Sequence, residues 1–410
     1  MKKIAVAYSG GLDTSVMVKW LKQKYDCEII TVTGNLGYVK ELDGLEEKAL
    51  ATGASKAVIV DLRKEFIEDY AFKALKSNAV YEGKYPLATA IGRPLLAKAL
   101  VDVARKEGCD TIAHGCTGKG NDQVRFEVNI WALAPDINII APLREWEFKS
   151  REQEIDFAIS NNIPVTVTQN RPYSIDGNLW GTAIECGILE EETLAAPEDA
   201  FQITKNPKDA PDEPEILEIE FLKGIPVAVN GENLDAVALI EKLNAIAAKH
   251  GIGRMDLIEN RFVGIKSREV YEAPGAVLLH AAHYEMEKLV IDRETYRYKQ
   301  DVANKVSNMI YDGMWFTPLF DALMAFVDET QKNVTGTVKY ELYKGNMWVI
   351  SRSSIYSLYN HNLATYTDED TFDHKSSEGF IKIISLPYKT IANNKAEIAS
   401  ALGRQISTGT

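Results

Sequence analysis

The amino-acid sequence predicts an α/β protein in which a doubly wound parallel sheet comes first, a second α+β domain follows, and a helical segment closes the chain. Two observations indicate the parallel sheet. Short apolar runs alternate with helical patterns up to about residue 165, and polar glycine-rich loops follow two of these runs. A third observation indicates the second domain, because alternating runs joined by short turns begin at Glu215.

The bulk properties bound the class of protein. A chain of 410 residues is long enough for two or three domains, and we expect them at residues 1–167, 168–373 and 374–410. The net charge of −13 argues against a general binder of nucleic acid or of anionic membranes, because such a protein needs a basic face. It leaves room for a local basic pocket.

Targeting and redox signals are also informative. No apolar run is long enough to span a bilayer, and the first expected strand begins without a secretory signal before it. The four cysteines form no CxxC pair and no zinc spacing: Cys27, Cys109, Cys116 and Cys186. The sequence therefore predicts a cytoplasmic protein with reduced thiols and no metal held by direct protein spacing.

Elements of the first domain follow from apolar periodicity. The expected strands are Ile4–Ala7, Ile29–Thr33, Ala57–Asp61, Thr111–His114, Asn138–Ala141 and Pro164–Thr168. The expected helices include Glu65–Ser77, Leu95–Glu107 and Glu152–Ser160, and Pro94 fits the first turn of the second of these. Ligands of such sheets bind beyond the carboxyl ends of the strands, so the loops there are the place to search for a site.

The first such loop, Tyr8–Ser15, joins the run Ile4–Ala7 to a helical pattern. At this junction the unpaired backbone N–H groups and the positive helix end point the same way, which favours an anion. The side chains and glycines that suit this role are Ser9, Gly10, Gly11, Thr14 and Ser15. Asp13 suits a helix N-terminus and can also hold magnesium.

This loop is not a Walker A loop, because no lysine followed by serine or threonine comes after its last glycine. Its phosphate contacts would depend on backbone amides, hydroxyls and metal. The pattern Ser-Gly-Gly-x-Asp-Thr resembles the pyrophosphate loop of ATP pyrophosphatases, which cleave ATP between the α and β phosphates. A plain glycine turn with a capped helix is the alternative interpretation.

A second loop, Gly115–Arg125, follows the expected strand Thr111–His114. Its Lys119 is followed by glycine, which excludes a Walker A reading. Arg125 falls in the next helix and suits a carboxylate. The other polar side chains that suit a substrate carrying a charged amine are Thr117, Asn121 and Asp122. We expect both loops at one sheet edge, and the alternative for the second loop is a solvated loop without a ligand. Gly34 follows the second expected strand, where it suits either the close approach of a ligand or a plain turn.

The second domain combines hairpins with helices. Residues 192–214 are rich in Pro, Asp and Glu and predict a surface excursion. The expected hairpins are Glu215–Phe221 with Pro226–Val229 and Gly336–Tyr343 with Met347–Ser353, and the expected helices are Leu234–His250, Gly275–Asp292, Arg293–Tyr311 and Pro318–Asp328. The last segment carries exposed apolar residues, which suggests docking on a neighbouring subunit.

Three stretches together resemble the argininosuccinate synthase family. They are Ala7–Ser15, His114–Glu127 and Ile258–Arg268, and the resemblance runs from residue 1 to about residue 360. It implies that citrulline, aspartate and ATP give argininosuccinate, AMP and pyrophosphate through citrullyl-AMP. It also implies a homotetramer, MgATP as co-substrate, no prosthetic group, and no nucleic acid or membrane partner.

The resemblance also implies site residues. ATP would be held by Ala7, Tyr8, Ser9, Gly10, Gly11, Leu12, Asp13, Thr14, Ser15, Gly34 and Gly115. Citrulline would be held by Tyr85, Ala90, Asn121, Arg125, Ser174, Ala183, Glu259 and Tyr271, and aspartate by Thr117, Asn121 and Asp122. Asp13 and Asp122 would position charge, and no side chain is expected to be a nucleophile. Ala90 and Ala183 stand where relatives can have serine, so their contacts would come from backbone atoms or water.

Two other functions compete with this one. The nearer is a different adenylating enzyme of the same superfamily, acting on a nucleotide, a tRNA base or another amide. A tRNA enzyme is expected to show a basic surface or zinc cysteines, and this chain has neither pattern. The other is a nucleotide-sensing protein without turnover.

Overall fold

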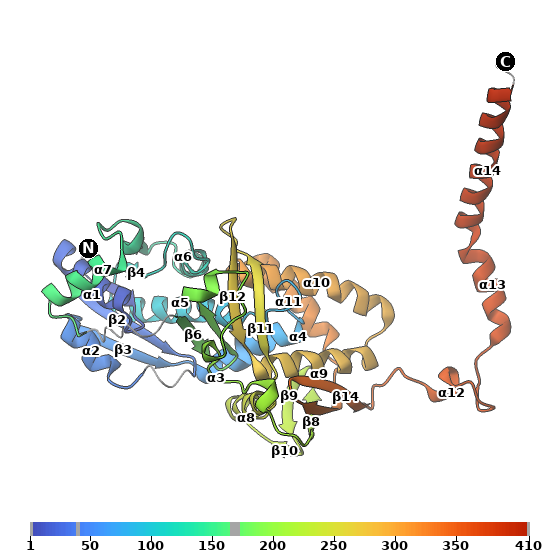
Figure 1. Ribbon diagram of the computed structural model, residues 1–410, viewed down its shortest axis with the longest axis horizontal. Coiled ribbons are helices and arrows are strands. Elements are labelled where there is room, and N and C mark those ends of the chain that lie inside the picture. The colour runs from blue at the N-terminus through green and yellow to red at the C-terminus, as the bar shows by residue number, and fades with distance from the viewer. Residues whose placement is uncertain (1–2, 38–41, 165–172, 408–410) are drawn as a thin grey trace. The chain divides into compact units, whose positions relative to one another are not determined.

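The computed structural model describes residues 3–37, 42–164 and 173–407, with side chains up to Leu402. The chain divides into two compact units, Met1–Ser357 and Leu358–Thr410, which are described separately. The first unit carries all the sheets (Figure 1). Most of the strand expected at Pro164–Thr168 and the domain boundary expected between residues 167 and 168 lie outside the described residues.

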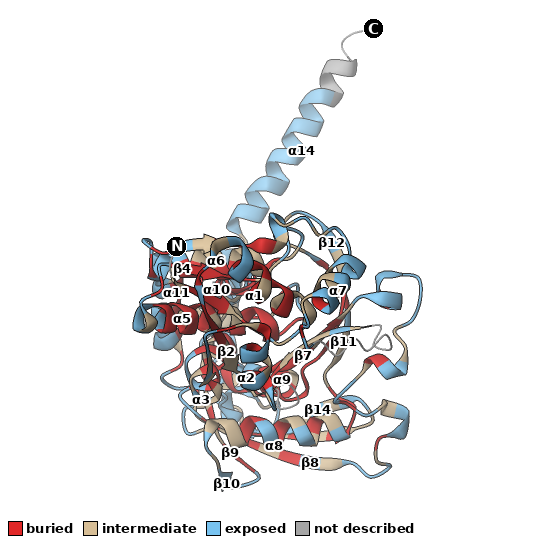
Figure 2. Ribbon diagram, turned by 90° about the vertical axis from the view of Figure 1, so that its left-hand side faces the viewer, coloured by how far each residue is buried: buried red, intermediate tan, exposed pale blue. Residues whose placement is uncertain are grey.

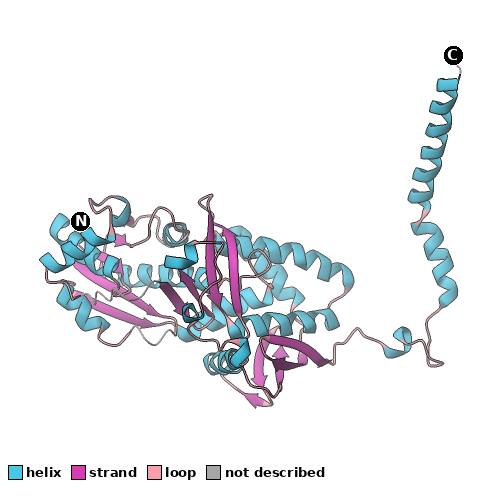
Figure 3. Ribbon diagram, viewed as in Figure 1, coloured by secondary structure: helices cyan, strands magenta, loops and turns pink. Residues whose placement is uncertain are grey.

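A five-stranded parallel sheet forms the first part of the chain (Figure 3). Its strands are β1 (Lys3–Ala7), β2 (Glu28–Asn35), β3 (Lys56–Asp61), β4 (Thr111–Ala113) and β5 (Asn138–Ile140). The order is β3-β2-β1-β4-β5, so the strand order reverses beside β1. This confirms the doubly wound sheet and places its switch point between β1 and β4, where such sheets bind ligands.

Alternating side chains of β1 build two cores on opposite faces of this sheet. Ile4 and Val6 pack with α1 and α2, whereas Ala5 packs with α5 and α6. The period of two along a strand produces this division. The helices of this part are α1 (Leu12–Tyr25), α2 (Leu45–Thr52), α3 (Arg63–Glu65), α4 (Phe72–Lys76), α5 (Ala88–Glu107), α6 (Asp122–Leu133) and α7 (Arg151–Ser160).

Two antiparallel sheets form the α+β part that the sequence predicts. The four-stranded sheet has the order β11-β12-β7-β6, and the five-stranded sheet has the order β10-β9-β8-β13-β14. The first consists of β6 (Ser174–Asn178), β7 (Gly181–Glu185), β11 (Arg254–Asn260) and β12 (Lys266–Glu272). The second consists of β8 (Glu215–Leu222), β9 (Ile225–Val229), β10 (Glu232–Asn233), β13 (Gly336–Tyr343) and β14 (Asn346–Ser353).

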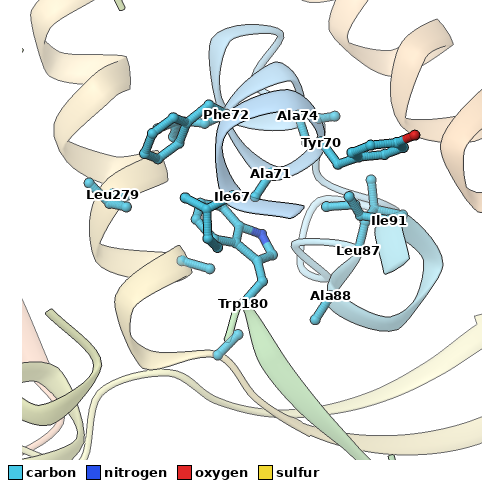
Figure 4. Close-up of a cluster of buried hydrophobic side chains, with 14 of the residues drawn as sticks. Ile67, Tyr70, Ala71, Phe72, Ala74, Leu87, Ala88, Ile91, Trp180 and Leu279 are labelled. Atoms are coloured by element: carbon cyan, nitrogen blue, oxygen red, sulfur yellow. The ribbon is translucent and has the colours of Figure 1, made fainter. Parts of the chain in front are cut away.

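One large core joins the helices of both parts of the first unit. The helices of the second part are α8 (Ala236–Lys249), α9 (Pro274–Val290), α10 (Arg293–Tyr311) and α11 (Pro318–Thr330). Trp180 is fully buried and lies among side chains of α4, α5 and α9 (Figure 4). Buried residues run along α5 and the strands near it (Figure 2). The two parts therefore share a hydrophobic interior.

Two local expectations about helices are wrong. The helix α5 begins at Ala88, so Pro94 lies inside it and not in its first turn. The predicted helix Glu65–Ser77 is interrupted, since Phe66–Ala71 winds as a π-helix between α3 and α4. In both places burial against neighbouring elements outweighs local backbone preference, because Phe66, Ile67 and Ile91 are completely buried.

The second unit contains the helices α12 (His361–Ala364), α13 (His374–Ile384) and α14 (Leu386–Ser407). The C-terminal segment expected at residues 374–410 lies within this unit, which begins at Leu358, and its expected start at residue 374 stays a prediction. No helix in the described part of the chain is long and apolar enough to cross a membrane.

Candidate active site

The two glycine-rich loops meet at one edge of the parallel sheet, as the sequence predicts. β1 and β4 are parallel neighbours, with Ile4 opposite Thr111, so the loops that follow them leave the sheet at the same end. A Cβ placed on Gly115 would lie 3.4 Å from Thr14 Cγ2. The second loop therefore packs directly against the helix start that follows the first loop.

Polar groups of the first loop are partly free and partly used within the loop. The hydroxyls of Ser9 and Thr14 lie 3.2 Å apart. The N-cap of α1 is Gly11, which has no side chain to cap the helix, and its N–H donates to Ser9 Oγ at 3.4 Å. Ser15 is fully buried, and its hydroxyl pairs with Tyr8 at 3.2 Å. The loop and the first turn of α1 thus offer backbone N–H groups and the hydroxyls of Ser9 and Thr14 to an anion, while Ser15 packs inside.

Gly34 has a packing reason to be glycine. It pairs with Val60 in β3, and a Cβ there would overlap the Leu96 side chain of α5. Its contact with adenosine stays a prediction. Asp13 is a candidate for a metal contact, because it lies beside Glu154 of α7, whose buried oxygen Oε2 has no hydrogen-bond partner among the described residues. Burial and the Asp13 carboxylate raise the pKa of Glu154 to about 8. These two carboxylates supply only oxygen ligands, which fits magnesium.

The second loop is tied to the α+β part through Asn121. The side-chain oxygen of Asn121 accepts a hydrogen bond from the backbone N–H of Phe262 at 2.8 Å, and Lys119 O accepts one from Arg261 at 3.4 Å. Thr117 is exposed, whereas Asn121 is buried. The segment between β11 and β12 therefore closes against the loop that follows β4.

An ion-pair chain crosses the site. Asp122 accepts from Arg93 Nε at 2.8 Å and from Arg125 Nη1 at 3.0 Å, and Arg93 also pairs with Asp176 of β6. Burial alone would raise the pKa of Asp122, but the two guanidinium groups more than offset it and hold the pKa below its ordinary value. Asp122 is therefore a fixed negative charge between two fixed positive ones.

A cluster of tyrosines surrounds Glu259. One carboxylate oxygen of Glu259 accepts from Tyr271 OH at 2.7 Å, and the other accepts from Tyr311 OH at 2.5 Å. Tyr271 stacks on Tyr85 with ring centroids 3.9 Å apart, and Tyr311 stacks on Tyr81 at 3.6 Å. The turn before α5 thus contributes both stacking partners.

Arg125 and Glu259 are joined through Tyr311. Arg125 Nε donates to the backbone oxygen of Tyr311 at 2.8 Å, and its guanidinium lies 4.8 Å from the ring centroid of Tyr311. Only 5% of Arg125 and 3% of Glu259 is exposed, so a substrate would meet both charges in a largely desolvated setting. A cation for a carboxylate and an anion for an ammonium are the recognition elements of a free amino acid.

The remaining predicted citrulline residues lie in β6, β7 and the start of α5. Ala183 pairs with Tyr271 on one side and with Asp176 on the other, and Ser174 is the exposed first residue of β6. Ala90 is completely buried in the first turn of α5. Any contact from Ala90 would come through its backbone.

Four further residues belong to this constellation but were not predicted: Tyr81, Arg93, Asp176 and Tyr311. Tyr81 precedes α5 and Arg93 lies in its second turn, on either side of the predicted Tyr85, and the polar spacing of Tyr85 and Arg93 was a signal. The sequence around Tyr311 contained no such signal, because Tyr311 lies 186 positions from Arg125. Only tertiary packing reveals its contact with both charged residues.

Comparison with known proteins identifies the family of the chain. Residues 3–164 match the family model described as "Arginosuccinate synthase N-terminal HUP domain", and residues 173–391 match "Arginosuccinate synthase C-terminal domain". The chain is 59% identical to an argininosuccinate synthase from Chlorobium luteolum over 95% of its length and 98% of that protein. It is 60% identical to one from Chlorobaculum tepidum over 97% and 99% of the two chains. The chain therefore belongs to the argininosuccinate synthase family.

Proposed function

We propose that this chain ligates L-citrulline and L-aspartate in arginine biosynthesis, with conversion of ATP to AMP and pyrophosphate. One observation carries the proposal beyond family membership. The loop that follows β1 and the Arg125–Tyr311–Glu259 group are brought together by the loop that follows β4, which touches both Thr14 and Phe262. An anion site and an amino-acid site are thereby linked.

The binding roles follow from charge. The backbone N–H groups at the start of α1, with Ser9 and Thr14, bind the pyrophosphate part of ATP. Arg125 binds the carboxylate of citrulline and Glu259 binds its ammonium, with Tyr85, Tyr271, Ser174, Ala90 and Ala183 around the chain. Thr117, Asn121 and Asp122 bind aspartate. Each Asp122 oxygen already accepts from an arginine, and a carboxylate has lone pairs left for a substrate ammonium.

The chemistry needs positioning rather than a protein nucleophile. The ureido oxygen of citrulline attacks the α-phosphorus, the bond from that phosphorus to the bridging oxygen breaks, and pyrophosphate leaves with the electron pair. The amine of aspartate then attacks the activated carbon, AMP leaves, and the amine loses its proton. Fixed charges such as the buried Arg125 and the half-buried Asp122 align the reactants before reaction.

Magnesium is implied as the partner of ATP. Among the residues that the structure describes, no group of three or more His, Cys, Asp and Glu side chains could hold a metal by itself. Asp13 and Glu154 are the carboxylates that would hold it together with phosphate oxygens. When bound, the ion neutralises charge on the phosphates.

We further propose that the chain acts as a cytoplasmic homotetramer in which the C-terminal unit contacts neighbouring subunits. The support is the amphipathic character of α13. Phe380, Ile381 and Ile384 are all more than half exposed. Exposed apolar side chains in a row are typical of a subunit contact.

An isotope-exchange experiment tests the reaction. The protein is incubated with MgATP and labelled pyrophosphate, with citrulline, ornithine or no amino acid. We expect label in ATP only with citrulline, because ornithine carries the same carboxylate and ammonium but no ureido oxygen. Exchange with ornithine, or exchange that needs no amino acid, would contradict the proposed function.

A further inference from the structure

The pyrophosphate loop has no lysine of its own, yet the structure brings one to it. Lys48 of α2 stands 38 positions after Gly10, and its ammonium donates a hydrogen bond to the backbone oxygen of Gly10. A Walker A loop carries its phosphate-binding lysine within the loop. Here the same charge arrives from a neighbouring helix.

The packing of α2 against the loop accounts for this placement. Gly10 has φ of +76°, and a Cβ there would overlap the Leu45 side chain. Leu45 is the first residue of α2, and Lys48 follows three positions later on the same helix face. Gly10 is therefore required both for the turn and for the close approach of the helix that carries Lys48.

The charge of Lys48 lacks a counter-ion among the described residues. No carboxylate of the described chain lies within 4.0 Å of its ammonium, whereas Lys56 of β3 pairs with Glu107 at 2.8 Å. Lys48 is partly buried, and this burial lowers its pKa. Removing a cation from water without an anion is unfavourable, so an anionic ligand would complete the site electrostatically.

Two independent features thus converge on the same anion. The uncapped N-terminus of α1 directs N–H groups toward the loop mouth, and Lys48 adds a full positive charge beside Gly10. An ammonium has three N–H donors, and Gly10 occupies one of them. The other two remain for phosphate oxygens.

We propose that Lys48 contacts the β and γ phosphates of ATP and stays on the pyrophosphate as it leaves. Negative charge builds up on the bridging oxygen as its bond to the α-phosphorus breaks, and a cation next to that group stabilises the transition state. The proposal rests on the proposed function only in taking ATP as the triphosphate. It assigns this chain a phosphate-binding residue that its loop motif does not contain.

Binding measurements on three variants test this role. Lys48→Met removes the charge and keeps most of the length, and Lys48→Arg keeps the charge. Lys22→Met is the matched control, because Lys22 of α1 also donates to a glycine oxygen, Gly53 O at 2.9 Å, but on the exposed surface. Calorimetry without citrulline or aspartate gives the dissociation constants of MgATP, magnesium pyrophosphate and AMP.

We expect Lys48→Met to weaken MgATP and pyrophosphate about tenfold, as for the loss of one charged hydrogen bond, and to leave AMP unchanged. Lys48→Arg should retain most of the affinity, and Lys22→Met should match the parent chain. Unchanged affinity for pyrophosphate in Lys48→Met would overturn the proposal. So would an equal loss for AMP, since that result indicates a disordered loop instead of a missing charge.

A measurement on the unsubstituted protein tests the same contact without relying on variants that could misfold. Acetylation of Lys48 and Lys22 is followed by mass spectrometry with and without magnesium pyrophosphate. Protection of Lys48 alone is expected, and equal labelling with and without pyrophosphate would refute the contact. These results do not depend on citrulline, so failure of the proposed ligation would show separately as missing citrulline-dependent exchange.

Discussion

At the scale of single residues, Glu259 shows how the site holds an ionised group in a buried place. Burial raises the pKa of this carboxyl, and the hydroxyls of Tyr311 and Tyr271 act in the opposite direction by stabilising the charged form. The net pKa is above the ordinary value. Each tyrosine hydroxyl therefore matters for keeping Glu259 able to bind an ammonium.

Replacement of Tyr311 by phenylalanine tests this point. The variant leaves one oxygen of Glu259 without its donor, so we expect the KM for citrulline to rise about fivefold, from the loss of one hydrogen bond. The KM for ATP should not change. Tyr340→Phe is the control, because Tyr340 is equally buried but lies in β13. Equal shifts in both variants would mean that Tyr311 acts only through stability.

The shifted pKa of Glu269 predicts that the stability of the fold depends on pH. Burial and repulsion by Glu185 raise its pKa from 4.5 to about 7, although Arg261 lies 2.6 Å away and opposes the shift. Between pH 4.5 and about pH 7, Glu269 holds a proton in the folded chain that it releases in the unfolded chain. The contribution of protonated Glu269 to the free energy of unfolding is therefore complete at low pH and is lost as the pH rises through about 7.

We expect Glu269→Gln to remove this dependence, because the amide stays neutral. The fall in unfolding free energy between about pH 5 and about pH 8 should shrink by on the order of 2 kcal/mol, measured by urea unfolding. Glu218→Gln in β8 is the control, because Glu218 is also half-buried and paired with one cation, Lys339. An unchanged difference between the two pH values in Glu269→Gln would contradict the assignment.

At the scale of elements, the turn between β6 and β7 attaches the four-stranded sheet to the start of α5. Asn178 donates to Ala88 O at 2.8 Å and accepts from the backbone N–H groups of Trp180 and Gly181 at 2.8 and 3.2 Å. Trp180 Nε1 donates to Pro86 O at 3.0 Å. One turn thereby fixes the sheet that carries Ala183 against the helix that carries Arg93.

Asn178→Ala removes all three hydrogen bonds of this side chain in a buried place. We expect a loss of about 2–3 kcal/mol in unfolding free energy, measured in urea. Asn138→Ala is the matched control, since this exposed side chain makes one bond of 3.3 Å to Asp110 O. A loss no larger than that of the control would show that packing of Trp180 alone holds the turn.

At the scale of the whole molecule, the C-terminal unit predicts an assembly. The helix α13 places the apolar residues Phe380, Ile381 and Ile384 in solvent within its own unit, while Lys375 lies among its polar residues. Covering such a face is favourable by about 25 cal/mol for each Å² of apolar surface. A second copy of the chain is the occupant that we expect.

Ile384→Glu in the full-length chain tests the assembly. A charge on the apolar face should shift the mass measured by light scattering from a tetramer to smaller species, whereas Lys375→Glu should leave it unchanged. A tetramer that persists in Ile384→Glu at low protein concentration would place the subunit contact elsewhere.

Much of the fold could be predicted because its signals are local. A short apolar run indicates β1 and a period-3.6 pattern indicates α1 from neighbouring residues alone, and the loop between them carries its own glycines. Parallel strands also end at one edge, which is why the meeting of the Thr14 and Gly115 loops followed from the motif order. The expectation for Pro94 failed because the burial of α5 outweighed a local preference.

The sequence by itself determined the strand–loop–helix junctions, the α/β class and the charged residues suited to an amino acid and a phosphate. Tertiary structure alone decided that Tyr311 would join Arg125 to Glu259, that Arg93 would hold Asp122, and that Lys48 would reach Gly10. The physical reason is the distance along the chain over which each interaction acts. Backbone preference and periodicity act over a few residues, whereas ion pairs and stacking in the site join side chains that only the packed core brings together.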